Sequence, residues 1–425
     1  MKVAVVGTGI SGNVAAYHLN KKHDVTVYEA GAYVGGHTNT VDVETAAGPL
    51  PIDTGFIVFN DRTYPNFISL LDELGVASHD SEMSFSVRSN RPALEYNGSN
   101  LNGLFAQRRN LVRPSFHRMI RDILRFNREA PLLLSEQDTE ITLGDYLRRE
   151  NYSREFVRHY LVPMGAAIWS AEPEMMEQMP AHFFIRFFHN HGLLSLDDRP
   201  QWRVITGGSR EYVKKLVAGH RERIRLNCPV ESITRLPEGV IIHAYGMPAE
   251  TYDAVFIACH SDQALLMLDD PSENERQVLG AIRYQYNHAV LHTDSSLMPR
   301  RPRAWASWNY HLPDDARDQV TLTYDMNRLQ SLTCDDQYFV TLNSNRDIDA
   351  GSVIREVGYD HPVFTAEAVA AQQRKGEIDG ANRTYYCGAY WRYGFHEDGV
   401  VSALSALRRF EEEQENAQQY LQRAS

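Results

Sequence analysis

Cysteine is scarce in this 425-residue chain, which holds four, far apart: Cys228, Cys259, Cys334 and Cys387. Because no CxxC pair and no His–Cys cluster occurs, we expect neither a disulfide framework nor a metal site, and reduced thiols indicate a cytoplasmic protein. No segment approaches the roughly 18 consecutive apolar residues that a transmembrane helix needs. The N-terminus, MKVAVVGTGISG, has the pattern of a strand and a turn rather than that of a signal peptide.

Positive charge is also scarce, because 43 Lys and Arg face 55 Asp and Glu, a net charge of −12. Nucleic-acid binding depends on neutralising phosphates with cationic side chains, so this composition excludes nucleic acid as an expected partner. The chain is otherwise typical of a globular protein, with 43% hydrophobic and 23% charged residues. At roughly 100–200 residues per domain, its length predicts two or three domains.

The N-terminal segment has a glycine-rich turn between two strand-like runs. Residues 2–6 (KVAVV) are apolar without alternation, as in a strand buried on both faces. GTGISG follows at 7–12, then a helical stretch, then a second apolar run that ends at Glu29, 20 residues after Gly9. This order predicts a dinucleotide-binding βαβ unit, in which Glu29 accepts a hydrogen bond from a ribose hydroxyl.

Each glycine of the turn has a physical reason to be there. Gly7 permits the tight turn, Gly9 lets a pyrophosphate approach the backbone, and Gly12 lets the helix pack on the strand. The free N–H groups of Ile10, Ser11 and Gly12, together with the helix dipole, are expected to bind the phosphates.

The motifs that follow resemble those of the flavin-containing amine oxidase superfamily, which includes amine oxidases, protoporphyrinogen oxidases, carotenoid desaturases and UDP-galactopyranose mutases. Residues 29–40 (EAGAYVGGHTNT) resemble its second fingerprint, whose glycine pair, here Gly35 and Gly36, passes under the flavin diphosphate. Those enzymes usually follow the pair with Arg, whereas this chain has His37. A neutral imidazole contacts phosphate less strongly than a guanidinium does.

Five further segments are similar to superfamily motifs, in the same order: 52–56 (IDTGF), 202–213 (WRVITGGSREYV), 228–233 (CPVESI), 252–260 (YDAVFIACH) and 385–404 (YYCGAYWRYGFHEDGVVSAL). The resemblance implies FAD contacts, beyond those above, at Thr54, Gly55, Val230, Gly388, Asp398, Gly399 and Val400. The helix expected from Gly399 would stabilise negative charge on the reduced flavin. Alternatively, Glu397 and Asp398 are capping acids.

The resemblance implies an α/β fold, with a Rossmann-like FAD-binding domain and its parallel sheet interleaved with an α+β substrate domain, as in amine oxidases and glutathione reductase. The FAD-binding domain is expected at 1–75, 201–268 and 381–425, and the substrate domain at 76–200 and 269–380. Strand-like alternation over 280–345 predicts an antiparallel sheet in the substrate domain.

Aromatic residues concentrate where a substrate chamber is expected: Trp169, Phe183, Phe184, Phe187, Phe188, Trp305, Trp308, Tyr310, Tyr390, Trp391 and Tyr393. Tyr390 and Trp391 are candidate catalytic residues because the C-terminal loop lies over the flavin in the superfamily, and His191 and His396 are candidates for proton handling. For each of these residues a purely structural role is the alternative.

Lysine bears on the reaction, because many amine oxidases of the superfamily place one near flavin N5, on the substrate-domain sheet. None of the six lysines of this chain lies between residues 216 and 374, which weakens the case for amine oxidation. Cys387, the candidate for a covalent flavin link, falls in a predicted buried strand, so we expect FAD to be bound non-covalently.

We therefore predict an FAD-dependent oxidoreductase that dehydrogenates a small hydrophobic substrate, such as a fatty-acyl chain, by hydride transfer to flavin N5. Amine oxidation, a redox-neutral flavin isomerase or mutase, and an NAD-binding protein without flavin are the alternatives. The segments 166–170 (AAIWS) and 187–194 (FFHNHGLL) are most similar to a bacterial group of predicted NAD/FAD-binding proteins. Members of that group are associated with cyclopropane-fatty-acid-synthase-like methyltransferases, which implies lipid metabolism.

One segment departs from the acidic composition: residues 107–128 carry seven Arg and one Asp. With apolar residues at helical spacing (Phe116, Ile120, Ile123 and Leu124), this segment predicts an amphipathic basic helix that contacts anionic lipid. The alternative is a helix with an ordinary solvated face.

Overall fold

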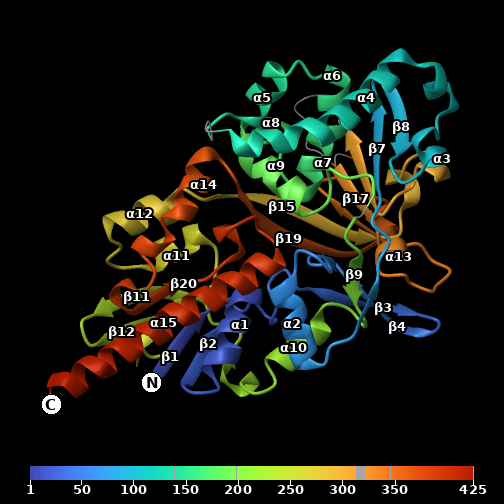
Figure 1. Ribbon diagram of the computed structural model, residues 1–425. Helices are drawn as coiled ribbons and strands as arrows, with labels where there is room; N and C mark the ends of the chain where they lie inside the picture. The colour runs from blue at the N-terminus through green and yellow to red at the C-terminus, as the bar shows by residue number, and fades with distance from the viewer. Residues whose placement is uncertain (137–139, 198, 313–320, 345, 425) are drawn as a thin grey trace.

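The computed structural model describes residues 1–136, 140–197, 199–312, 321–344 and 346–424 (Figure 1). A five-stranded parallel sheet of order β10-β2-β1-β14-β20 lies near the N-terminus. Its strands are β1 (Lys2–Val6), β2 (Asp24–Tyr28), β10 (Ile224–Arg225), β14 (Ala254–Ile257) and β20 (Thr384–Tyr386). Because every strand runs the same way, the loops that follow β1, β2, β14 and β20 meet at one edge.

Both faces of this sheet are covered, which explains why its strands show no alternation. Val3 and Val5 pack towards four helices, whereas Ala4 and Val6 pack towards a three-stranded antiparallel sheet. The helices are α1 (Ile10–Leu19), α2 (Pro65–Leu74), α10 (Arg210–Leu216) and α15 (His396–Ala424), and the strands are β11 (Val230–Leu236), β12 (Gly239–Ala244) and β13 (Glu250–Tyr252). The helices α11 (Ser261–Met267), α12 (Glu273–Gly280) and α14 (Ala366–Gln373) complete that second side.

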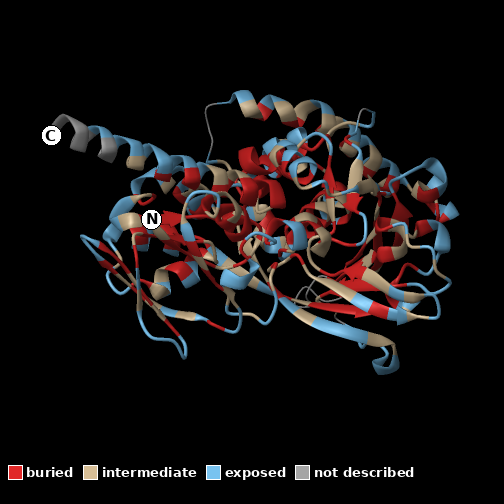
Figure 2. Ribbon diagram, turned by 90° about the horizontal axis from the view of Figure 1, so that it is seen from below, coloured by how far each residue is buried: buried red, intermediate tan, exposed pale blue. Residues whose placement is uncertain are grey.

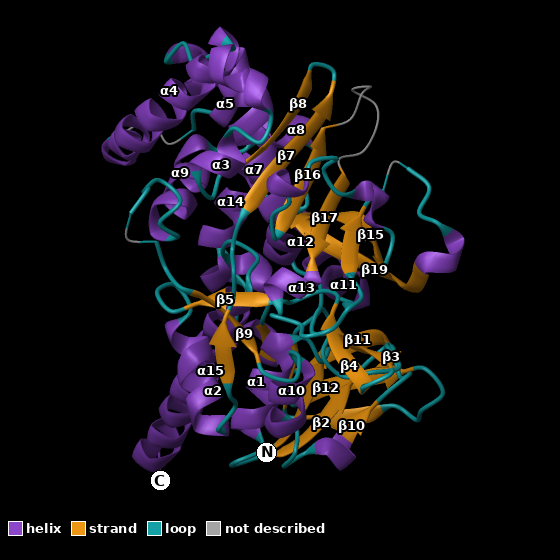
Figure 3. Ribbon diagram, turned by 90° about the vertical axis from the view of Figure 1, so that its right-hand side faces the viewer, coloured by secondary structure: helices purple, strands orange, loops and turns teal. Residues whose placement is uncertain are grey.

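A seven-stranded sheet of order β19-β15-β18-β17-β16-β7-β8 forms the second half of the molecule (Figure 3). It contains β7 (Phe85–Asn90), β8 (Ala93–Asn97), β15 (Arg283–His292), β16 (Trp308–Leu312), β17 (Thr321–Asp325), β18 (Phe339–Leu342) and β19 (Val353–Val363). All neighbours are antiparallel except β7 and β16, which are parallel. The antiparallel sheet expected over 280–345 is thus present, apart from residues 313–320 and 345, which lie outside the described residues.

Helices from the middle of the chain cover this second sheet and share its apolar core. They are α3 (Leu101–Leu104), α4 (Pro114–Glu129), α5 (Leu143–Arg149), α6 (Arg154–Phe156), α7 (Val162–Trp169), α8 (Pro173–Gln178) and α9 (Ala181–Asn190), with 3-10 or π turns η1 (Arg108–Val112), η2 (Ala130–Ser135) and η3 (Val157–Leu161). The remaining elements are β3 (Thr40–Thr45), β4 (Gly48–Asp53), β5 (Val58–Asn60), β6 (Ser78–Asp80), β9 (Trp202–Ile205), α13 (Met326–Leu329) and the 3-10 turns η4 (Arg221–Arg223), η5 (Ser295–Leu297), η6 (Pro302–Ala304), η7 (Ala350–Ser352), η8 (Lys375–Glu377), η9 (Ala381–Arg383) and η10 (Ala389–Trp391).

The two large sheets draw on interleaved parts of the chain. The parallel sheet takes strands from all three segments expected for FAD binding, and the seven-stranded sheet takes strands from both segments expected for the substrate domain. The boundaries themselves stay a prediction. Buried residues fill both halves, while the turns of α15 around residues 411–416 are largely exposed (Figure 2). Across the described residues, we find no helix with the length and apolar character to span a bilayer.

A buried ion pair joins β11, α12 and β20. The side chains of Arg235 and Glu275 are each 1% exposed, and Arg235 Nη2 donates to Glu275 Oε2 at 3.0 Å. Glu275 also accepts from Tyr386 Oη at 2.6 Å and from the backbone N–H of Ser272 at 2.7 Å. This network fixes the strand that begins at Val230 against the strand that leads to Gly388.

We expect Glu275→Ala to lower the free energy of unfolding by about 3 kcal/mol, because the buried Arg235 would keep only the half-exposed Asp270, 2.9 Å from its Nε, as a counter-charge. Urea denaturation followed by tryptophan fluorescence measures the change. The control is Glu411→Ala, since Glu411 pairs with Lys22 at the surface (side chains 54% and 70% exposed), and a change within about 0.5 kcal/mol is expected there. Equal effects of the two substitutions would contradict this account.

Candidate functional site

A cavity of about 740 Å³ runs along the carboxyl edge of the parallel sheet and continues to the seven-stranded sheet. Its walls come from the loops after β1, β2, β14 and β20 and from residues of β16, β17 and β19. This volume is in the range of ordinary ligand and cofactor sites. The position, outside the carboxyl ends of parallel strands, is where α/β sheets bind nucleotides.

The glycine turn at the start of α1 leaves a space that a diphosphate fits. A Cβ built on Gly9 would meet nothing within 4 Å, so the space in front of this residue is open. A Cβ on Gly12 would lie 2.0 Å from the carbonyl oxygen of Gly7, and one on Gly36 would lie 3.2 Å from Cα of Gly9. No side chain caps α1, so its first-turn N–H groups stay available to an anion.

Glu29 is fixed at the end of β2 by two backbone groups. Its Oε2 accepts from the N–H of Thr8 at 2.9 Å, and its Oε1 accepts from the N–H of Gly31 at 2.7 Å. Oε2 also accepts from the hydroxyl of Thr8, whereas Oε1 keeps a second lone pair, so a ribose hydroxyl can still donate to Oε1. Val230 lines the same cavity, as expected for a residue beside the adenine.

His37 occupies the position where the superfamily usually has Arg. Its ring stacks on Tyr359, with centroids 4.9 Å apart, and makes an edge contact with His361 at 5.2 Å. Burial holds the pKa of His37 well below its usual range, so the imidazole is neutral. Its Nε2 is enclosed and finds no hydrogen-bond partner among the described residues. No Lys or Arg is among the described residues that line the cavity.

The far part of the cavity is a chamber with mainly apolar walls. These walls carry Ile57, Val58, Ile168, Trp169, Trp308, Tyr324, Phe364, Tyr393 and Phe395. Trp169 is held in place by a hydrogen bond from Nε1 to the carbonyl oxygen of Tyr393 at 3.1 Å. Of the aromatic residues expected here, Phe183, Phe184, Phe187, Phe188 and Tyr310 are in the core behind the wall, and Trp305 is also outside the cavity wall.

The sequence profile of the family described as flavin containing amine oxidoreductase matches residues 10–299. The chain belongs to this family. It is therefore a flavin-dependent oxidoreductase, and non-covalently bound FAD is its cofactor. The resemblance seen in the motifs is confirmed, and an NAD-binding protein without flavin is excluded.

Solved structures of similar fold include cyclohexylamine oxidase from Brevibacterium oxydans, with 17% identity, 97% of this chain and 99% of that chain covered, and a TM-score of 0.69. The CLA-producing fatty acid isomerase from P. acnes has 14% identity, 96% and 98% coverage, and a TM-score of 0.70. A reduced UDP-galactopyranose mutase has 13% identity, 95% and 94% coverage, and a TM-score of 0.66. No significant match was found among curated proteins.

Most residues predicted to bind FAD lie together on the cavity wall: Gly7, Gly9, Ile10, Ser11, Glu29, Gly35, Gly36, His37, Gly55, Val230 and Gly388. Gly12, Thr54, Gly399 and Val400 lie behind it. Thr54 Oγ1 is 2.8 Å from Tyr359 Oη, and a Cβ on Gly399 would lie 2.6 Å from Ile10 Cγ2. The first turns of α15 and α1 are therefore in contact.

The two acids before Gly399 hold neighbouring backbone. Glu397 accepts from the N–H groups of Asn66 at 3.1 Å and Phe67 at 2.9 Å, so it caps α2 rather than α15. Asp398 accepts from the N–H groups of Tyr393 at 3.2 Å and Phe395 at 3.0 Å, and burial raises its pKa to about 6. Asp398 thus fixes the loop over the chamber, behind the cavity wall.

The four candidate catalytic residues divide into two pairs. Tyr390 and His396 line the cavity. Burial lowers the pKa of His396 to about 3, and its Nε2 is 3.1 Å from Thr38 Oγ1 and 3.0 Å from Tyr212 Oη, so the ring is neutral and already partnered.

Trp391 and His191 lie away from the cavity wall. Trp391 packs in the core behind it. His191 Nδ1 donates to the carbonyl oxygen of Phe187 at 3.0 Å, and the residue lines a separate hollow of about 390 Å³. Because that oxygen can only accept, Nδ1 carries the proton.

The thiols agree with a non-covalent cofactor. Cys387 is fully buried and absent from the cavity wall, and burial raises its pKa to about 12. Cys259 lines the cavity, but burial raises its pKa to about 12 as well. Both are protonated near neutral pH, so neither is a reactive thiolate.

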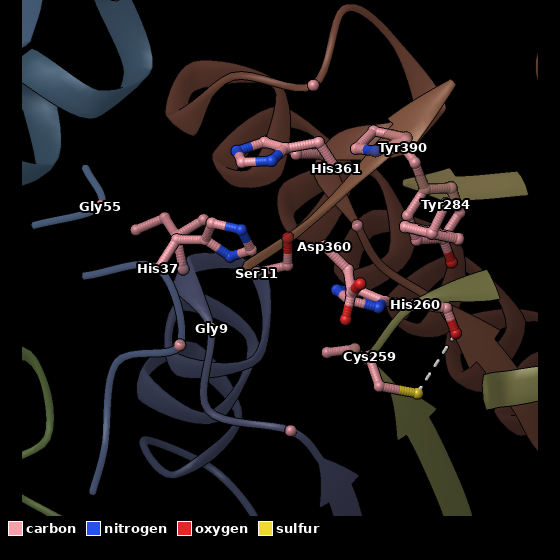
Figure 4. A pocket seen from close by; sticks show the side chains of 18 of the residues that line it. Gly9, Ser11, His37, Gly55, Cys259, His260, Tyr284, Asp360, His361 and Tyr390 are labelled. Carbon is pink, nitrogen blue, oxygen red and sulfur yellow. Dashed lines mark hydrogen bonds between the residues drawn. The ribbon is translucent and has the colours of Figure 1, made fainter. Parts of the chain in front are cut away.

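The sequence analysis missed four polar residues that line the cavity, which Figure 4 shows: His260, Tyr284, Asp360 and His361. His260 stacks on Tyr284, with centroids 4.3 Å apart. Asp360 and His361 belong to β19, a strand outside all the quoted motifs. Two ionisable residues directly before Pro362, at the end of a strand-like run, were the available signal.

We expect Gly9→Val to abolish FAD binding, because its side chain would fill the open space that fits the diphosphate. Glu29→Ala should weaken FAD binding by about 1.5–3 kcal/mol, the range for a hydrogen bond to a charged group. Titration of the apoprotein with FAD measures both. Gly376→Val is the matched control, since a Cβ there also meets nothing within 4 Å but the residue is outside the cavity wall. Unchanged affinity in both site variants would place the nucleotide elsewhere.

Proposed function

We propose that this flavoenzyme dehydrogenates a long apolar substrate, such as a fatty-acyl chain, as a cytoplasmic enzyme of lipid metabolism. Flavin, when bound, accepts a hydride at N5. The observation that carries the proposal is the composition of the chamber wall, whose residues from α7, β16, β17 and the C-terminal loop include no charged side chain among those described. Asp360 lies on the cavity wall outside this group of residues, near His260, whose pKa is lowered by burial despite the opposing charges of Asp262 and Asp360.

An apolar chamber favours a particular dependence on substrate length. Each Å² of apolar surface removed from water contributes roughly 25 cal/mol, so affinity should rise with chain length until the chamber is full. A small cationic amine would gain little from these walls and would lose its hydration. The absence of lysine from residues 216–374 further separates this chain from oxidases that use a lysine near N5.

A redox-neutral isomerase is the second candidate function. It is favoured by the similar fold of the fatty acid isomerase and the UDP-galactopyranose mutase. An isomerase acting on the same acyl substrates would use the same apolar chamber. The two candidates differ in one property, since only an oxidoreductase reduces its flavin with substrate and then needs an electron acceptor. Amine oxidation is the third candidate and predicts a different substrate class.

Anaerobic mixing of the purified protein with acyl lipids, fatty acids, monoamines and polyamines separates these candidates. We expect acyl compounds to bleach the flavin absorbance and amines to leave it unchanged. Substitution of Trp308 by Ser in the chamber wall should raise the acyl concentration needed for half-maximal bleaching. Bleaching by an amine with all lipids inert would refute the proposal, and acyl turnover without bleaching would establish the isomerase.

We also propose that the protein contacts anionic membranes through an apolar tip formed by Leu101, Leu111 and Val112. These side chains are 74%, 51% and 83% exposed. Arg108 lines a hollow together with Leu101 and Leu111, and the basic helix α4 follows directly. Exposed apolar side chains beside arginines suit the interface of an anionic bilayer, where each Arg contributes about 1 kcal/mol.

Only part of the basic segment is available for this contact. Arg125 lies over the ring of Tyr152 at 4.0 Å, and Arg118 is 3.8 Å from Glu155. Arg121 is exposed on α4 beside them and makes no ion pair recorded among the described residues. Arg108 and Arg121 are therefore the informative positions for charge reversal, because substituting Arg125 would also disturb packing.

Co-sedimentation with vesicles of phosphatidylglycerol, compared with phosphatidylcholine, tests the tip. We expect binding to the anionic vesicles only, with a fall of at least tenfold in Arg108→Glu/Arg121→Glu and in Leu111→Asp/Val112→Asp. Flavin content should be unchanged in both variants. Arg221→Glu, an exposed charge reversal on the other half of the molecule, is the control. Equal binding by all four proteins would refute membrane contact at this surface.

A further inference from the structure

His361 lies where the nucleotide part of the cavity meets the chamber. It is near the end of β19, paired across the ladder with Gln285 of β15. Its ring contacts His37 (Figure 4). Pro362 and Phe364, which follow it in sequence, also line the cavity. A polar group at this junction can contact a bound flavin.

Two asparagines, the buried Asn287 and the half-buried Asn343, connect His361 to the backbone in a series of hydrogen bonds. The N–H of His288 donates to Asn343 Oδ1 at 2.9 Å. Asn343 Nδ2 then donates to Asn287 Oδ1 at 2.7 Å. Asn287 Nδ2 lies 2.9 Å from His361 Nδ1 and 3.1 Å from the carbonyl oxygen of Gln285.

The donor and the acceptor in each of these hydrogen bonds are fixed by the backbone groups at both ends of the series. A backbone N–H can only donate, which assigns the oxygen of Asn343 and so leaves its NH₂ to face Asn287. A carbonyl oxygen can only accept, which independently assigns the NH₂ of Asn287 to the side of Gln285 and His361. Asn287 therefore donates to Nδ1 of His361, and Nδ1 must be the unprotonated nitrogen.

The proton of His361 is consequently on Nε2. Burial lowers the pKa of His361 to about 4, so the ring is neutral near pH 7 and carries a single N–H. Among the described residues no hydrogen-bond partner is recorded for Nε2, and this atom is not enclosed by the protein. His396 has no such free nitrogen, because its Nε2 is already within hydrogen-bond distance of two hydroxyl groups. His361 thus presents a free donor to the cavity.

We propose that His361 binds the flavin as a hydrogen-bond donor through Nε2, and that Asn287 and Asn343 are positioning residues that keep it in this tautomer. A fixed donor in a water-poor site stabilises the electron-rich reduced flavin more than the oxidised form. No Lys or Arg is among the described residues of the cavity wall. The stabilisation of the reduced flavin therefore depends more on a neutral donor such as His361. The inference goes beyond the proposed substrate and depends only on flavin binding.

The flavin potential tests the donor. We expect His361→Leu to reduce the preference for reduced over oxidised flavin about tenfold, a fall of about 30 mV for a two-electron couple. His361→Gln, which keeps an N–H donor, should retain most of the potential. His288→Leu is the matched control, because its side chain is 43% exposed and only its backbone N–H takes part in the series of hydrogen bonds. Anaerobic dye-equilibration of the holoenzymes measures all of them.

Nitrogen-15 NMR of ring-labelled histidine tests the tautomer in the holoenzyme, with the His361 signals assigned by their loss in His361→Gln. We expect a neutral ring protonated on Nε2, and a mixture of tautomers in Asn287→Leu, whose potential should fall in the same direction. Protonation of Nδ1 in the native holoenzyme, or a potential unchanged in His361→Leu, would overturn the proposal. If His361→Leu purifies without flavin, the potential of Asn287→Leu decides, and no change there refutes it.

Discussion

Three glycine-containing turns approach one another around Gly9 so closely that side chains could not fit between them. Gly12 lies against the turn at Gly7, Gly36 against Gly9, and Gly399 against Ile10. The space left open in front of Gly9 is where the backbone can reach a diphosphate without steric hindrance. These contacts require the ends of β1 and β2 and the start of α15 to meet at one point, although they are almost 400 residues apart in the sequence. The interleaved chain path follows from this requirement.

The histidines around the cavity are held in their neutral forms. Burial lowers the pKa values of His37, His361 and His396. Near neutral pH the diphosphate is therefore met by N–H groups and a helix dipole rather than by cationic side chains. Fixed dipoles of this kind do not need to reorganise when the flavin changes charge. Such a site is suited to hydride transfer from a substrate that itself carries no charge at the reacting carbon.

The nucleotide end of the site could be predicted because its signals are local in sequence. Gly9, Glu29 and Gly36 each belong to a short motif whose spacing fixes the geometry. The chamber end could not be predicted in the same way. His361 reaches its position through the pairing of β19 with β15, which joins residues that are 74 apart, as in the contact of Asn287 with His361.

Tyr390 and Trp391 show that adjacent residues of one motif can point in different directions. The sequence placed both Tyr390 and Trp391 over the flavin, but the 3-10 turn η10 separates their directions. Tyr390 faces the cavity, whereas Trp391 packs beneath it, with the ammonium of Lys375 at 5.8 Å from its ring. A similar effect at α4 leaves Leu124 48% exposed while Phe116 is buried. The motif predicted the segment, and the local backbone decided which side chain points where.

Asn287 is an unfavourable residue for the stability of its strand. Asn287 is fully buried at the centre of β15, where β-branched residues pack better and an unpaired amide costs free energy. The cost is offset only because Gln285, Asn343 and His361 all bond to it. An apolar residue at 287 would satisfy the sheet without this network, but it would release the ring of His361. Departures from local preference of this kind are expected at functional sites rather than in structural cores, so the arrangement is better explained by what His361 does in the cavity than by what Asn287 adds to the fold.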